Sequence, residues 1–131
     1  MKKIVVTLLL GFVTHTCLFA QSTIGKSREE LTKITNTNTN IKLLKGVDTD
    51  TLNFLGGIQS IYYYKKDICC SSKSTLPSKF EAPMVDNLKT DNYKKLNNNT
   101  WVSPAGNIKV VFKEDKTKGI FTILTTPVIN K

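Results

Sequence analysis

The residues that most often carry catalysis or bind metals are scarce in this chain. It contains one histidine, His15, and three cysteines, Cys17, Cys69 and Cys70, among 131 residues. The 10 acidic residues are scattered, and no two of them show the spacing of a paired-carboxylate motif. The glycine pair at residues 56–57 lacks the spacing of a phosphate-binding loop. The capacity for catalysis or metal binding therefore depends on how many of these residues remain in the mature protein.

The N-terminus has the pattern of a secretory signal peptide. Lys2 and Lys3 form a basic start, Ile4 to Val13 is an almost unbroken apolar run, and small Ala20 suits the residue before the cleavage site. The apolar run has about half of the ~20 residues that a membrane-spanning helix needs, which disfavours an uncleaved anchor. We expect residues 1–21 to be a signal peptide and residues 22–131 to be one domain, with no transmembrane span in the mature form.

A lipoprotein is the remaining alternative for this segment. Cys17 would carry the lipid, but Thr14, His15 and Thr16 stand where a Leu and small residues normally precede such a cysteine. We therefore expect an exported protein without lipidation at Cys17, located in the periplasm or outside the cell.

Cleavage removes His15 and Cys17 and lowers the net charge from +9 to +7. The mature chain then has no histidine, so Ser-His-Asp and Cys-His catalysis and histidine metal sites are excluded. Asp48 and Asp50 resemble a calcium loop, but the glycine and the downstream glutamate of such a loop are absent. We expect no catalytic residue, no metal site and no cofactor.

Cys69 and Cys70 leave three interpretations open. Adjacent residues of a strand point to opposite faces, so one thiol would face the core and the other solvent. An oxidising envelope also permits a disulfide between two chains or a strained bridge between the neighbours. A redox function is the weakest interpretation, because the pair lacks CxxC spacing.

The first half of the domain reads as a helix followed by strands. Ser27 with Glu30 forms a capping box, which predicts a short amphipathic helix over residues 27–35. The Thr-Asn alternation of residues 35–40 favours a loop, with a polar edge strand as the alternative. Strand composition and turn residues then predict two further features. They are a short strand over 52–55 and a hairpin with strands 58–65 and 68–76 around a turn at 65–67.

The second half repeats this order. Pro83 and the spacing of Met84, Val85 and Leu88 predict a helix over 82–90. Alternation predicts a three-stranded meander with strands 100–103, 108–113 and 120–126. The expected class is α+β: an antiparallel sheet of five to six short strands with one or two short helices on one face.

Two stretches resemble known envelope proteins. Ile24 to Leu31 resembles the opening of the module found in the small lipoprotein of the barrel-assembly machinery and in β-lactamase-inhibitor-protein-like domains, and Ser60 to Cys69 is similar to its aromatic strand and return strand. The resemblance implies a helix packed on an antiparallel sheet. The Leu-Gly-x-Pro usual after the first helix is absent. The whole mature chain also looks like small uncharacterised secreted proteins of Bacteroidetes. That match includes residues 19–21, Tyr62 to Tyr64, Ile68-Cys69, Pro77, residues 92–93 and Trp101.

Three functions follow from these patterns. The first is a non-catalytic binding module of the envelope whose partner is an unknown envelope protein, because exposed Tyr and Trp are enriched at interfaces. Its candidate interaction residues are Tyr62, Tyr63, Tyr64, Trp101, Lys65 and Lys66. Strand alternation requires that some of the tyrosines belong to the core instead.

The second function is binding of anionic lipid headgroups or glycans through a basic surface, which the net charge favours. Against it, Arg28 is the only arginine, and arginine is the preferred residue for bidentate phosphate recognition. Nucleic acid is not expected for an exported protein. The third function, a small carboxylate-based hydrolase, would need a concave pocket that holds two acids.

Overall fold

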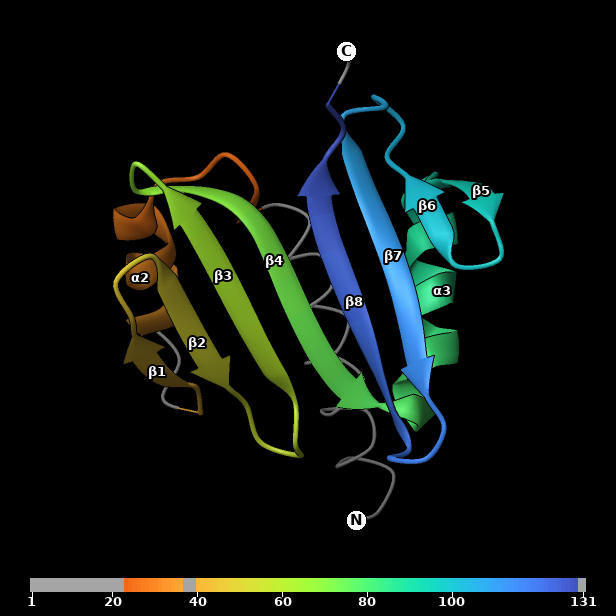
Figure 1. Cartoon of the computed structure of the whole chain (residues 1–131), viewed down its shortest axis with the longest axis horizontal. Helices are drawn as coiled ribbons and strands as arrows, with labels where there is room; N and C mark the ends of the chain where they lie inside the picture. The colour runs from red at the N-terminus through yellow and green to blue at the C-terminus, as the bar shows by residue number, and fades with distance from the viewer. Residues whose placement is uncertain (1–22, 37–39, 130–131) are drawn as a thin grey trace.

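The computed structural model describes residues 23–36 and 40–129, and these form one antiparallel sheet of eight strands with two α-helices and a 3-10 turn (Figure 1). The predicted signal peptide lies outside the described residues. No helix within them has the length and apolarity needed to cross a bilayer. The elements are α2 (Arg28–Asn36), β1 (Lys42–Lys45), β2 (Thr49–Asn53), β3 (Gln59–Lys65), β4 (Ile68–Pro77), η1 (Ser78–Phe80), α3 (Glu81–Thr90), β5 (Lys94–Asn97), β6 (Thr100–Val102), β7 (Ile108–Asp115) and β8 (Ile120–Pro127).

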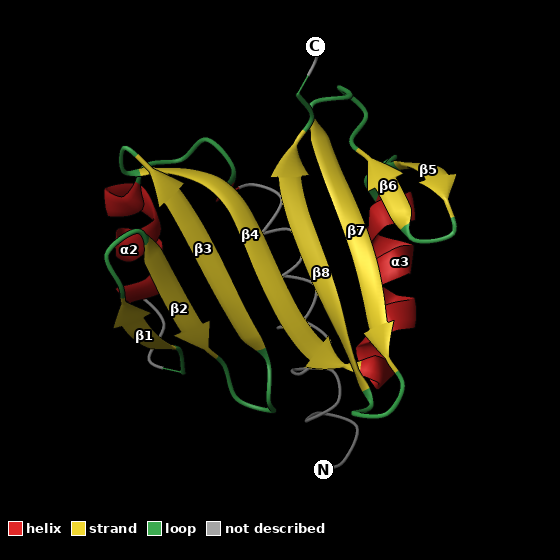
Figure 2. Cartoon of the chain, viewed as in Figure 1, coloured by secondary structure: helices red, strands yellow, loops and turns green. Residues whose placement is uncertain are grey.

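The sheet is built from two halves with the same element order. Each half is a helix followed by four antiparallel strands, and the strand order is β1-β2-β3-β4-β8-β7-β6-β5. The last strands of the two halves therefore meet at the centre, where β4 pairs with β8. Both helices lie behind the sheet in the view of Figure 2, one behind each half. The short strands β1 and β5 form the two edges.

Local sequence signals explain how the first half starts and turns. The Ser27 hydroxyl accepts the Glu30 amide at 3.2 Å, and the Glu30 carboxylate accepts the Ser27 amide at 3.1 Å. This reciprocal pair is the predicted capping box. The hairpin between β3 and β4 turns at Lys66 and Asp67, both with positive φ (51° and 60°). Such a two-residue turn matches the right-handed twist of the strands.

The hydrophobic core consists of two clusters on the helix side of the sheet. Leu31 of α2 packs with Leu52, Tyr62, Tyr64 and Cys69. Met84 and Leu88 of α3 pack with residues of the second half and the centre of the sheet, namely Ile58, Leu76, Phe80, Trp101, Val110, Phe112, Phe121 and Ile123. Between the clusters lies a strip of small buried polar residues, Ser60, Ser72, Ser74 and Thr125. The hydroxyls of Ser60 and Ser74 bond each other at 2.8 Å.

The α+β class and the antiparallel sheet are confirmed, whereas the predicted strand count was too low. The helices expected over 27–35 and 82–90 are α2 and α3, shifted by one residue at most at each end. The hairpin and the C-terminal meander occur as predicted, and the strand expected over 52–55 begins earlier, at Thr49. The two strands not predicted are β1 and β5, whose side chains are mostly exposed on both faces. A strand that is exposed on both faces has no alternation of apolar and polar residues, so this pattern cannot reveal it in the sequence.

Candidate functional site

Three of the four predicted aromatic contact residues belong to the core. The exposed fractions of Tyr62, Tyr64 and Trp101 are 1%, 5% and 4%. Tyr63 alone is partly exposed, because it points to the opposite face of β3 from its two neighbours. The mixed burial that strand alternation required therefore places Tyr62 and Tyr64 in the core, and it leaves Tyr63 as the tyrosine of β3 that lies on the other face of the sheet.

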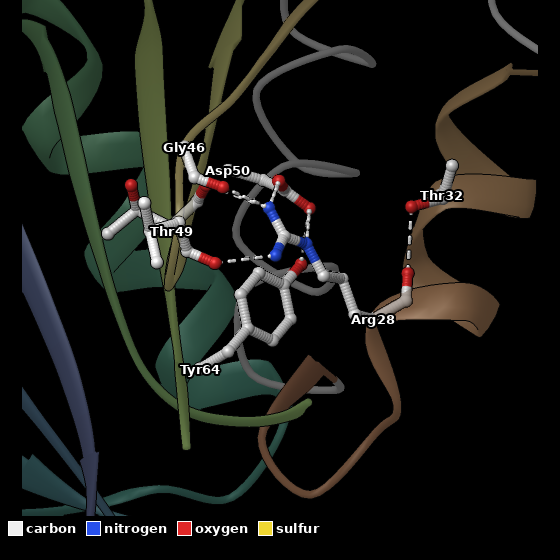
Figure 3. A network of polar contacts seen from close by, with 7 residues as sticks. Arg28, Thr32, Gly46, Thr49, Asp50 and Tyr64 are labelled. Atoms are coloured by element: carbon white, nitrogen blue, oxygen red, sulfur yellow. Dashed lines mark hydrogen bonds and ion pairs between the residues drawn. The ribbon is translucent and has the colours of Figure 1, made fainter. Parts of the chain in front are cut away.

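Tyr64 belongs to a polar network that fixes α2 to the sheet (Figure 3). The Arg28 guanidinium donates to both carboxylate oxygens of Asp50, with Nη2–Oδ1 at 2.7 Å and Nε–Oδ2 at 3.3 Å. It also donates to the carbonyls of Gly46, Val47 and Thr49 in the β1–β2 turn. Its carbon Cζ lies 5.1 Å from the centroid of the Tyr64 ring. One arginine thus connects a helix start, a turn and two strands.

Asp50 is the buried centre of this network, with an exposed fraction of 2%. Besides Arg28 it accepts the Tyr64 hydroxyl at 3.0 Å. The hydrogen bond to Asp50 raises the pKa of Arg28, and burial together with the bond to Asp50 raises the pKa of Tyr64 well above its usual range. Through these partners Asp50 connects the start of α2 to β2 and β3.

Cys69 and Cys70 are both free thiols in different surroundings. Cys69 is buried in the core, where burial raises the pKa of its thiol to about 11. Cys70 is partly exposed and lies at a β-bulge, since Tyr63 pairs with Ser71 while Tyr64 pairs with Cys69. The Cys70 thiol donates to the Tyr63 carbonyl at 3.3 Å. The bulge points Cys69 and Ser72 to the same side, so both are buried.

Lys65 and Lys66, the predicted basic contact residues, are exposed at the end of the β3–β4 hairpin. They lie at the rim of the sheet, away from the buried side chains of Tyr62 and Trp101. The structure therefore does not bring the predicted contact residues into one patch. Only Tyr63 and Lys65, two positions apart on β3, share a face.

The face of the sheet opposite the helices is uncovered among the described residues (Figure 2). Strand register places a row of apolar side chains interrupted by Lys73 across its middle, because Ile61 is next to Lys73, Lys73 to Leu124 and Leu124 to Val111. Leu44 on β1 continues the row beside Thr51. We call this set the cross-sheet row: Leu44, Thr51, Ile61, Lys73, Leu124, Val111 and Thr100.

Members of the cross-sheet row are open to solvent. Leu44 and Leu124 are 50% and 41% exposed, and Ile61 and Val111 are partly exposed. Exposed lysines lie on the same face, by strand alternation from Tyr63, Lys73 and Val111 and by the pairing of Lys94 with Val102. They are Lys65, Lys73, Lys94, Lys109 and Lys113. This open face carries apolar side chains along its middle, with Lys73 among them, and further lysines around them.

Sequence reasoning missed this surface because its seven members come from seven strands, and only Leu44, Ile61, Leu124 and Val111 among them are apolar. Alternation within a single strand places Ile61, Val111 and Leu124 on the face opposite to their buried neighbours, without showing that the three lie side by side. The signal that could have found the surface is that these second faces are themselves partly apolar in neighbouring strands.

Comparisons of the chain with protein-family models, curated proteins and solved structures found no match. The resemblance to envelope modules therefore stays a prediction. Within residues 23–36 and 40–129 no three metal-ligating side chains of His, Cys, Asp or Glu lie together.

Proposed function

We propose that the protein is an exported, non-catalytic interaction module that binds a partner protein of the envelope through the open face of its sheet. The observation that carries the proposal is the cross-sheet row, where exposed Leu124 and Leu44 flank partly exposed Ile61 without a helix above them. A contiguous exposed apolar surface rimmed by polar groups is typical of an interaction site.

The charges of the open face define the chemistry of the partner. Lys73 lies inside the row, and Lys109 and Lys113 flank Val111 along β7. A complementary partner surface would present apolar side chains surrounded by carboxylates. Tyr63, beside Thr49 and Ser71 in register, offers the aromatic anchor that interfaces favour.

The test is capture of envelope proteins on the immobilised full chain, read by mass spectrometry against two variants. Leu124→Asp places a charge in the row and should lower affinity for the captured partner at least thirtyfold, the effect of losing about 2 kcal/mol. Val47→Asp changes an apolar residue that is 88% exposed in the β1–β2 turn and should leave capture intact. Equal capture by both variants, with both shown to be folded by circular dichroism, would exclude the open face.

A second candidate uses the same lysines. Their position on one face favours binding to anionic lipid headgroups or glycans by long-range attraction. Lys73→Glu should then abolish salt-sensitive retention on heparin or on vesicles of anionic lipid, whereas Lys33→Glu on α2 should not. Wild-type protein that elutes in the void volume at low salt would refute this second candidate.

A further inference from the structure

A cleft of about 440 Å³ lies at the edge of the second half, and its lining residues Trp101 and Phe112 point to the opposite face of the sheet from the cross-sheet row. The start of α3 forms one wall with Glu81 and Val85, which are one helical turn apart. The β5–β6 hairpin and the end of β7 form the rest. Asn99 fixes these two parts to each other, because its carbonyl accepts the Phe112 amide at 2.8 Å. A volume of this size accommodates a small ligand.

The floor of the cleft is aromatic. Trp101 and Phe112 both line it, and their exposed fractions are only 4% and 6%. The Lys95 ammonium lies 5.6 Å from the centroid of the Trp101 ring, which it reaches from the paired position on β5. Lys95 is exposed, so its flexible side chain can leave the ring when another group stacks there.

The rim carries an unusual balance of polar groups. Glu81 and Glu114 bring carboxylates, Lys95 brings an ammonium group, and Asn98 and Asn99 bring amides; Lys113 also lines the cleft, but alternation on β7 directs its side chain to the open face. Carboxylates only accept hydrogen bonds, ammonium groups only donate them, and amides do both. An anion would meet the two carboxylates of this rim, and a cation would meet the Lys95 ammonium group. A hydroxyl both donates and accepts, so several hydroxyls on one ligand can satisfy the whole rim.

We propose that this cleft binds an uncharged saccharide. The apolar C–H face of a sugar ring would replace Lys95 on Trp101, and its hydroxyls would donate to Glu81 and Glu114 and accept from the displaced Lys95 and from the amides of Asn98 and Asn99. This inference goes beyond the proposed protein-binding function, because Trp101 and Phe112 lie on the helix side of the sheet, opposite to the open face.

Binding in the cleft can be followed by the fluorescence of the single tryptophan. Trp101 is the only tryptophan in the chain, so its fluorescence changes when a ligand replaces Lys95. The full chain is titrated with maltose, cellobiose and diacetylchitobiose, and in parallel with glucuronate, glucosamine and phenylalanine. We expect saturable binding of at least one neutral disaccharide, at least tenfold tighter than any charged probe. Saturation-transfer NMR confirms that the sugar contacts the protein.

Isosteric variants separate the cleft from other surfaces. Glu81→Gln and Glu114→Gln keep the shape but lose a charged acceptor, and each should weaken saccharide binding about tenfold. Glu29→Gln on α2, which is an exposed glutamate outside the cleft, should bind as the wild type does. All three variants should still capture the protein partner, so failure of one proposal is distinct from failure of the other. No saturable response to any neutral disaccharide, tighter binding of phenylalanine, or equal loss in the Glu29 control would overturn the proposal.

Discussion

Replacement of Arg28 is the sharpest test of how this fold is held together. Its guanidinium makes two bonds to the Asp50 carboxylate and three to carbonyls of the β1–β2 turn. Arg28→Ala leaves the buried Asp50 charge with the Tyr64 hydroxyl as its remaining donor among these contacts. Removing one partner of a buried ion pair costs about 3–5 kcal/mol. Because the Arg28 side chain is 19% exposed, we expect the lower end, about 3 kcal/mol.

A loss of this size is a large part of the stability of a small domain, which totals about 5–15 kcal/mol. It corresponds to a fall in Tm of about 12 °C at roughly 4 °C per kcal/mol. Arg28→Lys keeps the charge but has donors on one atom only, so it cannot reach Asp50 and the turn carbonyls together. We expect it to lose about 1–2 kcal/mol.

The assay is urea unfolding of the full chain, followed by circular dichroism and Trp101 fluorescence. Lys33→Ala is the matched control on the same helix, because its bond to Glu29 joins side chains that are 74% and 79% exposed. The Lys33→Ala substitution should lower the free energy of unfolding by about 0.5 kcal/mol or less. A double-mutant cycle adds Asp50→Ala, and the double variant should be more stable than the sum of the single losses predicts. Additive losses, or an Arg28→Ala loss no larger than that of Lys33→Ala, would refute the reasoning.

Four further predictions concern the thiols and the turns. In the folded protein iodoacetamide should modify Cys70 and spare buried Cys69, as peptide mass mapping will show; modification of both at equal rates contradicts the core position of Cys69. Because the pKa of Cys69 is raised to about 11, the unfolded chain releases this proton first. Stability should therefore be unaffected below the ordinary thiol pKa and fall between about pH 9 and pH 11, and a Cys69→Ala variant should lack this component of the slope. Lys66→Asn should raise stability by about 0.5 kcal/mol because asparagine tolerates the left-handed backbone better, and an unchanged urea midpoint would count against strain there. Gly46→Ala should lower the Tm, since its new Cβ would meet the Thr49 side chain and carbonyl, and wild-type stability would mean that the turn rearranges without cost.

The elements with strong local signals were predictable from the sequence. The capping box at Ser27 and Glu30 and the alternation of β7 and β8 each use neighbouring residues only. The edge strands were not predictable in the same way, because β5 exposes all of its side chains and shows no period.

The candidate sites depend on contacts between distant residues. Arg28 and Asp50 are separated by 22 positions, and nothing near either residue indicates the other. The composition held one usable signal. A single arginine in a lysine-rich chain indicates a position where one side chain must donate several hydrogen bonds at once. The three tyrosines show the reverse case, in which alternation correctly required mixed burial but could not assign the face until the sheet neighbours of β3 were known.

The pairing of β4 with β8 has a consequence for the order of folding. All other strand pairs join strands that follow one another in the chain, whereas β4–β8 closes a loop that contains α3 and three strands. Loop-closure entropy makes this the slowest pairing to form, so the strands within each half can pair before the two halves join. The polar strip of Ser72, Ser74 and Thr125 runs along that junction. The same junction also pairs buried Leu76 with Phe121, so the larger core is completed only when the two halves join, and the folding barrier should lie at this seam.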